Sequence, residues 1–120
     1  MMFRENVVAY IMQTYGDEPE YLWKRNDTTC VFRHSDTKKW YAALLSVPYE
    51  KLGLAKEGIV DILDLKCDPL MSGSLHDGKG CFPGYHMNKE HWITLLLDGT
   101  VNEDDIIPLI DLSFDLTDKK

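Results

Sequence analysis

Three short runs rich in aromatic and β-branched residues follow one another between residues 20 and 48, and they constrain the fold more than any other feature. The runs are EYLWKR, TCVFRH and KWYAALLSV. They are separated by NDT and SDTK, whose Asn, Asp and Ser residues favour turns. Pro48 ends the third run because proline cannot donate a hydrogen bond to a neighbouring strand. The pattern predicts consecutive antiparallel hairpins.

Helical patterns precede and follow these runs. Apolar residues at helical spacing predict a helix over residues 3–15 that stops at Gly16. The segment YEKLGLAKEG reads as a loop or a short helical turn, and residues 59–67 as a fourth strand. A short helix is predicted from Pro69 to about His76, because Asp68 before Pro69 suits a helix start. The run WITLLL predicts a further strand, which ends at an Asp-Gly turn.

The acidic segment NEDDIIPLIDLSFDL predicts a C-terminal helix. Asn102 suits the cap position, and the acids of the first turn complement the positive end of a helix. Pro108 conflicts with this start, so the helix either kinks there or begins later. The order of helix, strands, helix, strand and helix favours a single α+β domain, residues 1–120, with a mostly antiparallel sheet.

Composition and length exclude several classes of protein. A chain of 120 residues with 44% hydrophobic residues can bury a core without disulfides or a structural metal. No apolar run approaches the ~20 residues that cross a bilayer, and the first ten residues do not resemble a signal peptide, so we expect a cytoplasmic protein. Three widely spaced cysteines, Cys30, Cys67 and Cys81, fit reduced thiols better than a disulfide framework.

The net charge of −7 is unevenly distributed along the chain. Residues 1–60 hold eight Lys or Arg and eight Asp or Glu, whereas residues 61–120 hold five and twelve. The acidic second half should repel a polyanion. Any contact with nucleic acid would therefore be local, through the basic stretch at residues 23–40.

The window FPGYHMNKEHWITLLLDG, residues 82–99, contains the densest set of candidate site residues, but it matches no catalytic or metal-binding motif. His86 and His91 are five residues apart, which places them on different faces of either a helix or a strand. Cys81 near His86 lacks a third, orienting group. The acids Glu103 to Asp105 suit a solvated helix start. We therefore expect no metal, no cofactor and no enzymatic activity.

A nucleic-acid interface is the first of two functional hypotheses. Its candidate residues are Lys24, Arg25, Arg33, Lys38 and Lys39 on the hairpins, with Asn88 and Lys89 from the window. Basic side chains on a β-ribbon can contact phosphates, and binding to DNA would then be weak and salt-sensitive. In this interpretation Asn88 caps a brief turn, an imidazole ties the loop, and Lys89 meets the partner. The alternative is that these cations only keep the hairpins soluble and unpaired.

The segments DLKCDP and FPGYHMNKEHWITLLLDGTV resemble the MmcQ/YjbR family, as do YGDEPEYLW, CVFRH and KKWYAALL, in the form common in low-GC Gram-positive bacteria. The residues that carry the resemblance are Lys66, Cys67, Asp68, Pro69, Tyr85, His86, Met87, Asn88, Lys89, His91, Trp92, Asp98 and Gly99. The resemblance implies a frataxin-like (CyaY-like) α+β domain, with N-terminal and C-terminal helices packed on one side of an antiparallel sheet. It also implies DNA binding through two hairpins likened to a double wing.

The second hypothesis is a binding domain without enzymatic activity. Here Tyr85, His86, His91 and Trp92 line a pocket for a small ligand, or form a surface for a protein partner. A ligand that raises the melting temperature would distinguish this hypothesis from nucleic-acid binding.

Overall fold

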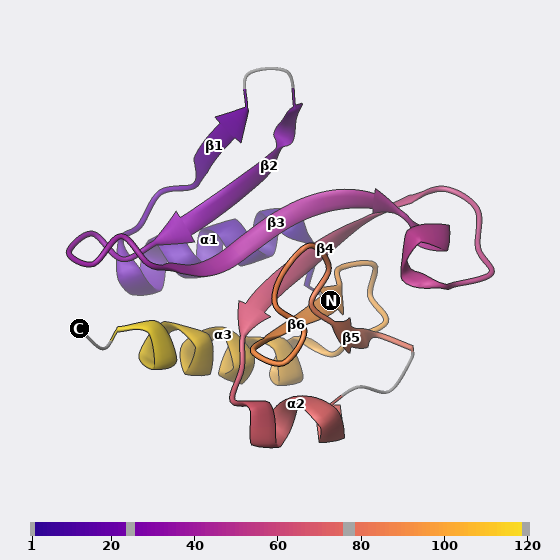
Figure 1. Cartoon of the computed structure of the whole chain (residues 1–120). Helices are drawn as coiled ribbons and strands as arrows, with labels where there is room; N and C mark the ends of the chain where they lie inside the picture. Colours follow the sequence, from indigo (N-terminus) through magenta and orange to yellow (C-terminus); the bar gives the residue numbers. More distant parts are fainter. Residues whose placement is uncertain (1, 24–25, 76–78, 119–120) are drawn as a thin grey trace.

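The predicted hairpins form the first half of a six-stranded antiparallel sheet in the computed structural model (Figure 1). The structure describes residues 2–23, 26–75 and 79–118, and the side chains of 23, 26, 27 and 72–74 are also left out of the description. The strands lie side by side in the order β1-β2-β3-β4-β6-β5. Their bounds are Glu20–Trp23 (β1), Asn26–Arg33 (β2), Trp40–Pro48 (β3), Ile59–Lys66 (β4), Cys81–Pro83 (β5) and Trp92–Leu96 (β6).

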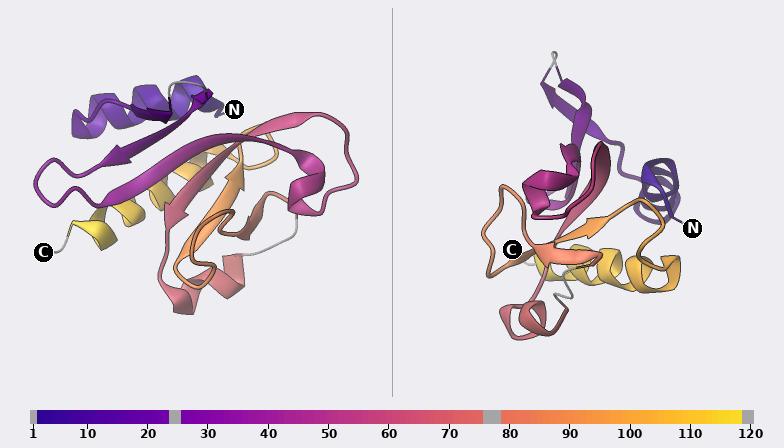
Figure 2. Two further views of the ribbon diagram at one scale, coloured as in Figure 1. Left: turned by 45° about the horizontal axis from the view of Figure 1, so that its top comes forward. Right: turned by 90° about the vertical axis from the view of Figure 1, so that its right-hand side faces the viewer.

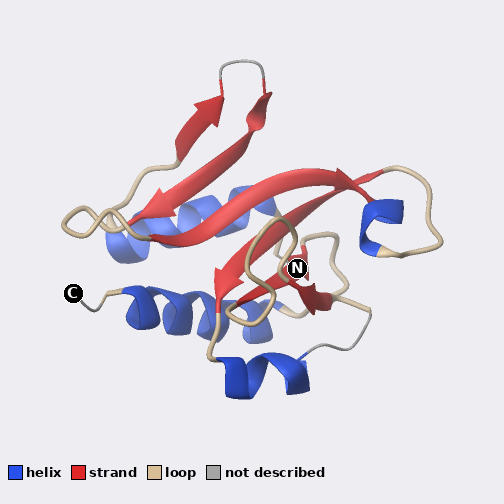
Figure 3. Ribbon diagram, in the orientation of Figure 1, coloured by secondary structure: helices blue, strands red, loops and turns tan. Residues whose placement is uncertain are grey.

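Within these described ranges, three α-helices and one 3-10 helix complete the fold (Figure 3). Their bounds are Arg4–Tyr15 (α1), Tyr49–Leu52 (η1), Pro69–Leu75 (α2) and Glu103–Thr117 (α3). The α+β class is thus confirmed. None of the helices in the described ranges has the length and apolar character needed to cross a membrane.

The two long helices cover one face of the sheet, as the family resemblance implied (Figure 2). Side chains of Val7 and Ile11 from α1 and of Ile106 and Ile110 from α3 pack into the main core. Alternate residues of the strands meet them there, for example Leu63 and Leu65 on β4. We call this side of the sheet the helical face.

The opposite side, which we call the open face, is covered only in part. Val60 and Ile62 of β4, together with Phe82 and Leu96, form a smaller core under η1 and Tyr85. In Figure 2 (right), η1 lies on the opposite side of the sheet from α1 and α3. The loop of residues 84–91 joins β5 to β6, and its Tyr85 packs against this smaller core. The open face therefore has room for a site beside this loop.

Two helix boundaries refine the sequence predictions. Asp68 Oδ1 accepts a hydrogen bond from the amide of Leu70 at 2.9 Å, and α2 begins at Pro69 as expected. The α3 helix begins directly after Asn102 and runs through Pro108, so the later start is wrong. Pro108 is exposed, and packing of Ile106 and Ile110 in the core outweighs the helical hydrogen bond that proline cannot donate. Strand β5 was not predicted.

Candidate functional site

The loop of residues 84–91 is closed by its own hydrogen bonds. The Gly84 amide donates to the Trp92 carbonyl at 3.0 Å, and the Trp92 amide donates to the Asn88 carbonyl at 3.0 Å. Asn88 Oδ1 accepts from the Glu90 amide at 2.9 Å, which confirms the predicted cap. Lys89 Nζ donates to the Gly84 carbonyl at 2.9 Å, so this exposed ammonium, predicted to meet a partner, is engaged within its own loop.

A buried carboxyl group lies beneath this loop. Asp64, on β4, is fully buried, and its Oδ1 accepts a hydrogen bond from the hydroxyl of Thr94 on β6. Thr94 Oγ1 in turn accepts from the Tyr85 amide at 2.8 Å, which links the loop to the carboxyl. Asp64 Oδ2 has no hydrogen-bond partner among the described residues. The open face thus contains one buried oxygen that can still accept a hydrogen bond.

The ionisation of Asp64 reflects this environment. Burial raises the pKa of the carboxyl from 3.8 to about 7, although the Thr94 hydrogen bond and the nearby charge of Lys89 both lower it. A group with this pKa changes its proton occupancy near neutral pH, which ordinary surface carboxyls do not. Sequence reasoning missed Asp64. The available signal was an acid within the apolar strand IVDILDLK.

A pocket of about 270 Å³ lies on the same face of the sheet, and Asp64 is not among its lining residues. It is lined by Leu22, Thr29, Val31, Trp40, Ala43, Leu45, His86 and Met87. Ala43 and Asp64 are directly opposite each other on β3 and β4, so their side chains share the open face. Strands β1, β2 and β3 supply the floor, and the loop supplies His86 and Met87.

His86 is held in an unusual backbone conformation at the edge of this pocket. Its φ is 61°, in the left-handed region that non-glycine residues rarely adopt. Its ring lies 4.1 Å from the ring of Tyr85, centroid to centroid. Such local strain is retained when surrounding contacts fix it, and it is concentrated at functional sites. Of the residues predicted to line a pocket, His86 lines this one, whereas Trp92 is buried in β6.

The other motif residues join the end of β4 to the start of β6. Lys66 on β4 is directly opposite Trp92 on β6, and its Nζ lies 5.5 Å from the centroid of the indole ring. The Cys67 amide donates to the His91 carbonyl at 2.7 Å. DLKCDP and HMNKEHW, distant in sequence, are therefore adjacent in space. These contacts have a structural role.

The residues proposed to bind nucleic acid are dispersed. Arg33 Nε lies 2.7 Å from Glu20 Oε2, which pairs this guanidinium across the β1–β2 hairpin. Lys38 and Lys39 are exposed in the turn between β2 and β3. Lys24 and Arg25 lie outside the described residues. The remaining two, Asn88 and Lys89, belong to the loop.

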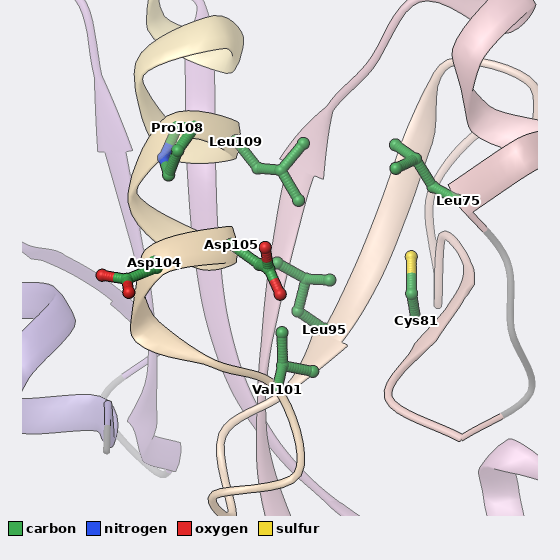
Figure 4. Close-up of a pocket in the computed structure, with 8 residues that line it drawn as sticks. All are labelled: Leu75, Cys81, Leu95, Val101, Asp104, Asp105, Pro108 and Leu109. Carbon is green, nitrogen blue, oxygen red and sulfur yellow. The ribbon is translucent and has the colours of Figure 1, made fainter.

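A larger cavity, of about 320 Å³, lies on the other side of the molecule between α2, β6 and the start of α3 (Figure 4). Its walls are mainly apolar, with the thiol of Cys81 and the carboxylate of Asp105 among them. Figure 4 shows the Asp105 side chain directed toward the cavity and that of Asp104 directed away from it. Both acids are exposed in the first turn of α3, as expected for partners of the helix dipole. The buried Asp64 lines neither this cavity nor the pocket beside His86, but it shares the open face with the latter.

The fold and motif define a small α+β domain with a two-helix face and a loop-covered open face. The family model described as YjbR matches residues 12–116, and the chain belongs to this family. Over 117 residues the chain is 44% identical to the uncharacterized protein YyaQ of Bacillus subtilis, covering 98% of this chain and 99% of that protein.

Solved structures agree with this assignment. A crystal structure of a Pseudomonas syringae protein is similar with a TM-score of 0.93 and 45% identity, covering 97% of this chain and 99% of that one. A solution structure from the same organism gives a TM-score of 0.87 at 45% identity, over 97% of this chain and 93% of that one. A Deinococcus radiodurans protein is similar with a TM-score of 0.74 and 26% identity, over 100% of this chain and 81% of that one.

Proposed function

We propose that this protein is a binding domain without enzymatic activity, and that it binds a small, mainly apolar molecule in the pocket beside His86. The observation that carries the proposal is that three features share one face of the sheet. An apolar pocket, a residue in a strained conformation and a buried carboxyl oxygen lacking a partner among the described residues all lie on the open face. Ligand sites combine apolar walls with a few placed polar groups in this way.

The size and walls of the pocket limit the ligand. A volume of about 270 Å³ lies just below the usual range for drug-sized molecules, which favours a compound of one or two rings. Trp40 and Met87 offer an aromatic ring and a thioether, which suit contact with a flat apolar surface. Thr29 and His86 can hydrogen-bond to a polar substituent at the edge.

Fragment screening by NMR tests the proposal. We expect one- and two-ring aromatic fragments to shift the backbone amide signals of Val31, Ala43 and Met87 in ¹⁵N-labelled protein. His86→Asn keeps a residue that tolerates positive φ but removes the imidazole, so it should weaken the same fragments several-fold. His91→Asn, in the same loop but outside the lining residues, is the matched control. Fragments that bind only elsewhere, or with equal affinity in both variants, would contradict the proposal.

Nucleic-acid binding is the second candidate, and a specific observation supports it. The β1–β2 hairpin extends away from the body of the protein, as a wing would (Figures 1 and 2). Lys38 and Lys39 are exposed at the adjacent β2–β3 turn, and Lys38 has a φ of 64°. Contacts would be made to phosphates and would not depend on base sequence.

Fluorescence anisotropy with labelled double- and single-stranded DNA tests this candidate. Binding at low salt that falls steeply with added salt, and that is lost in the Lys38→Glu/Lys39→Glu variant, would support it. A matched Lys51→Glu/Lys56→Glu variant controls for the change in net charge. Absence of binding at low salt, or equal losses in the two variants, would exclude the hairpin as a phosphate-contacting wing.

A further inference from the structure

A cluster of three potential metal ligands lies where the β2–β3 turn meets the end of α3, far along the chain from the window of residues 82–99. It consists of His34, Asp36 and Asp118. One ligand atom from each lies within 4.8 Å of the others. His34 is 3% exposed, and both aspartates are exposed.

The hydrogen bonds of His34 determine which of its ring nitrogens carries the hydrogen. His34 Nε2 lies 2.7 Å from the hydroxyl oxygen of Thr117. That hydroxyl has one hydrogen and lies 2.8 Å from the Ser113 carbonyl and 3.2 Å from the Phe114 carbonyl, so when it donates to either of them it accepts from the imidazole. Nε2 then carries a hydrogen, and in the neutral ring Nδ1 presents a lone pair.

This lone pair points at negative charge. Nδ1 lies 3.5 Å from Asp118 Oδ1. Two acceptors that face each other repel, and a metal ion between them turns this repulsion into two favourable contacts. Two exposed acids would not by themselves define a site. The buried ring nitrogen directed at them completes the set of donor atoms that a metal site needs.

The surroundings of the ring favour a fixed ligand. His34 packs against Tyr41 and Phe114, with ring centroids 5.0 Å and 4.4 Å away. A hydrogen bond from the non-ligating nitrogen, here to Thr117, is the usual way in which proteins orient a metal-binding histidine. The ring is thus positioned before any ion arrives.

We propose that His34, Asp36 and Asp118 form a binding site for a divalent transition-metal ion such as Zn²⁺, which fastens the β2–β3 turn to the end of α3. An imidazole nitrogen with two carboxylates suits zinc better than Mg²⁺ or Ca²⁺, which prefer oxygen ligands alone. Zinc bonds of about 2.0–2.2 Å place ligand atoms roughly 3–4 Å apart. The two exposed aspartates must rotate to reach that spacing, and Asp36 then keeps or exchanges the hydrogen bond that its Oδ1 accepts from the Thr37 amide at 2.7 Å.

Three protein ligands leave one tetrahedral position for water. Lys38 and Lys39 belong to the same turn, and their positive charges oppose a cation nearby. We therefore expect micromolar rather than nanomolar affinity. This site is independent of the ligand pocket.

Zinc titration of the EDTA-treated, dialysed full chain tests the proposal. Calorimetry should show one Zn²⁺ bound per chain, and long-range ¹⁵N–¹H spectra should show the His34 Nδ1 signal shifting while Nε2 keeps its hydrogen. Asp36→Asn and Asp118→Asn should each weaken binding at least tenfold. Both positions are exposed, so both variants are expected to fold. Asp115→Asn, an exposed acid on the same helix, should leave zinc binding unchanged.

Several outcomes would overturn the proposal. One is the absence of zinc binding. Another is that Asp36→Asn and Asp118→Asn bind zinc with the same affinity as the parent protein, which would place the ion at other histidines or cysteines. A third is Nδ1 of His34 remaining protonated with zinc present, which would make the cluster an ordinary imidazolium ion pair. Equally strong binding of Mg²⁺ would also contradict it, because the imidazole would then contribute nothing.

Discussion

At the scale of single residues, Asp64 makes the stability of the fold depend on pH. Its carboxyl has a pKa of about 7 in the folded protein and an ordinary value of 3.8 when exposed. Between these two values the folded state binds more protons than the unfolded state. Stability therefore falls as pH rises from about 4 to about 7, and the cost of burying the ionised group is fully present above that range.

The Asp64→Asn variant should lack this pH dependence. The separation between 3.8 and about 7 corresponds to an upper bound of roughly 4 kcal/mol. We expect the variant to gain stability relative to the parent protein between pH 5 and pH 8, by at least 1 kcal/mol. Urea unfolding at both pH values measures the difference, with exposed Glu57→Gln as the control. Parallel pH profiles for the parent and Asp64→Asn would show that the carboxyl is not shielded from water.

The same residue shows why the candidate site was only partly predictable. The sequence identified His86 and the loop around it, because unusual residue types are clustered there. It could not place Asp64 beneath that loop, since this depends on the pairing of β4 with β3 and β6. Likewise, His34 and Asp118 are brought together only when α3 packs on the helical face.

At the scale of elements, the two long helices are joined by a shared carboxylate. Asp111 on α3 accepts hydrogen bonds from the phenol hydroxyls of Tyr10, at 2.7 Å, and Tyr15, both on α1. Burial and the Asp111 hydrogen bond raise the pKa of both tyrosines, so the hydroxyls remain donors at any physiological pH. Tyr15 also stacks on Phe114, with ring centroids 3.8 Å apart.

Removing this carboxylate should loosen α1 from α3. Asp111→Ala leaves two partly buried hydroxyls without their acceptor, and we expect a loss of about 1–3 kcal/mol in the free energy of unfolding. Asp111→Asn keeps one acceptor oxygen and should lose less. Chemical denaturation gives both values. Asp115→Ala, exposed on the same helix, provides the comparison, and an equal loss there would mean that the shared hydrogen bonds contribute little.

Most elements were predictable because their local signals agree with their packing. The hairpin runs became β1, β2 and β3, and the Asp68-Pro69 signal marked the start of α2. Strand β5 was missed because it has three residues and ends in proline, and only its pairing with β6 makes it a strand. Pro108 suggested a later start for α3, because proline is unfavourable inside a helix. The prediction failed because local propensity does not include the apolar surface that the helix buries.

At the scale of the whole molecule, the three cysteines report how the protein opens. None forms a disulfide, and their exposed fractions are 0% for Cys30, 2% for Cys67 and 6% for Cys81. Burial raises the pKa of the Cys30 and Cys67 thiols, which further slows their reaction as thiolates. Cys81 differs, because it lines the cavity beside α2.

The α2 side of this cavity is formed by a short helix that exposes apolar side chains. Leu70 on α2 is 91% exposed and Met71 is 41% exposed, and among the described side chains of this helix only Leu75 packs against the main core. A movement of α2 would uncover Cys81 without unfolding the sheet, whereas Cys30 and Cys67 require the core to open. Local and global opening should therefore be separable.

Alkylation by iodoacetamide, followed by mass spectrometry across a urea series, measures this separation. We expect Cys81 to react at least tenfold faster than the other two in the absence of urea, with little dependence on urea. Cys30 and Cys67 should react together, at rates that rise with urea as steeply as global unfolding does. Filling the cavity with Leu95→Phe should slow Cys81 selectively if the variant stays folded, which the unchanged protection of Cys30 would verify. Equal rates for all three thiols in the parent protein would show instead that α2 opens only with the whole domain.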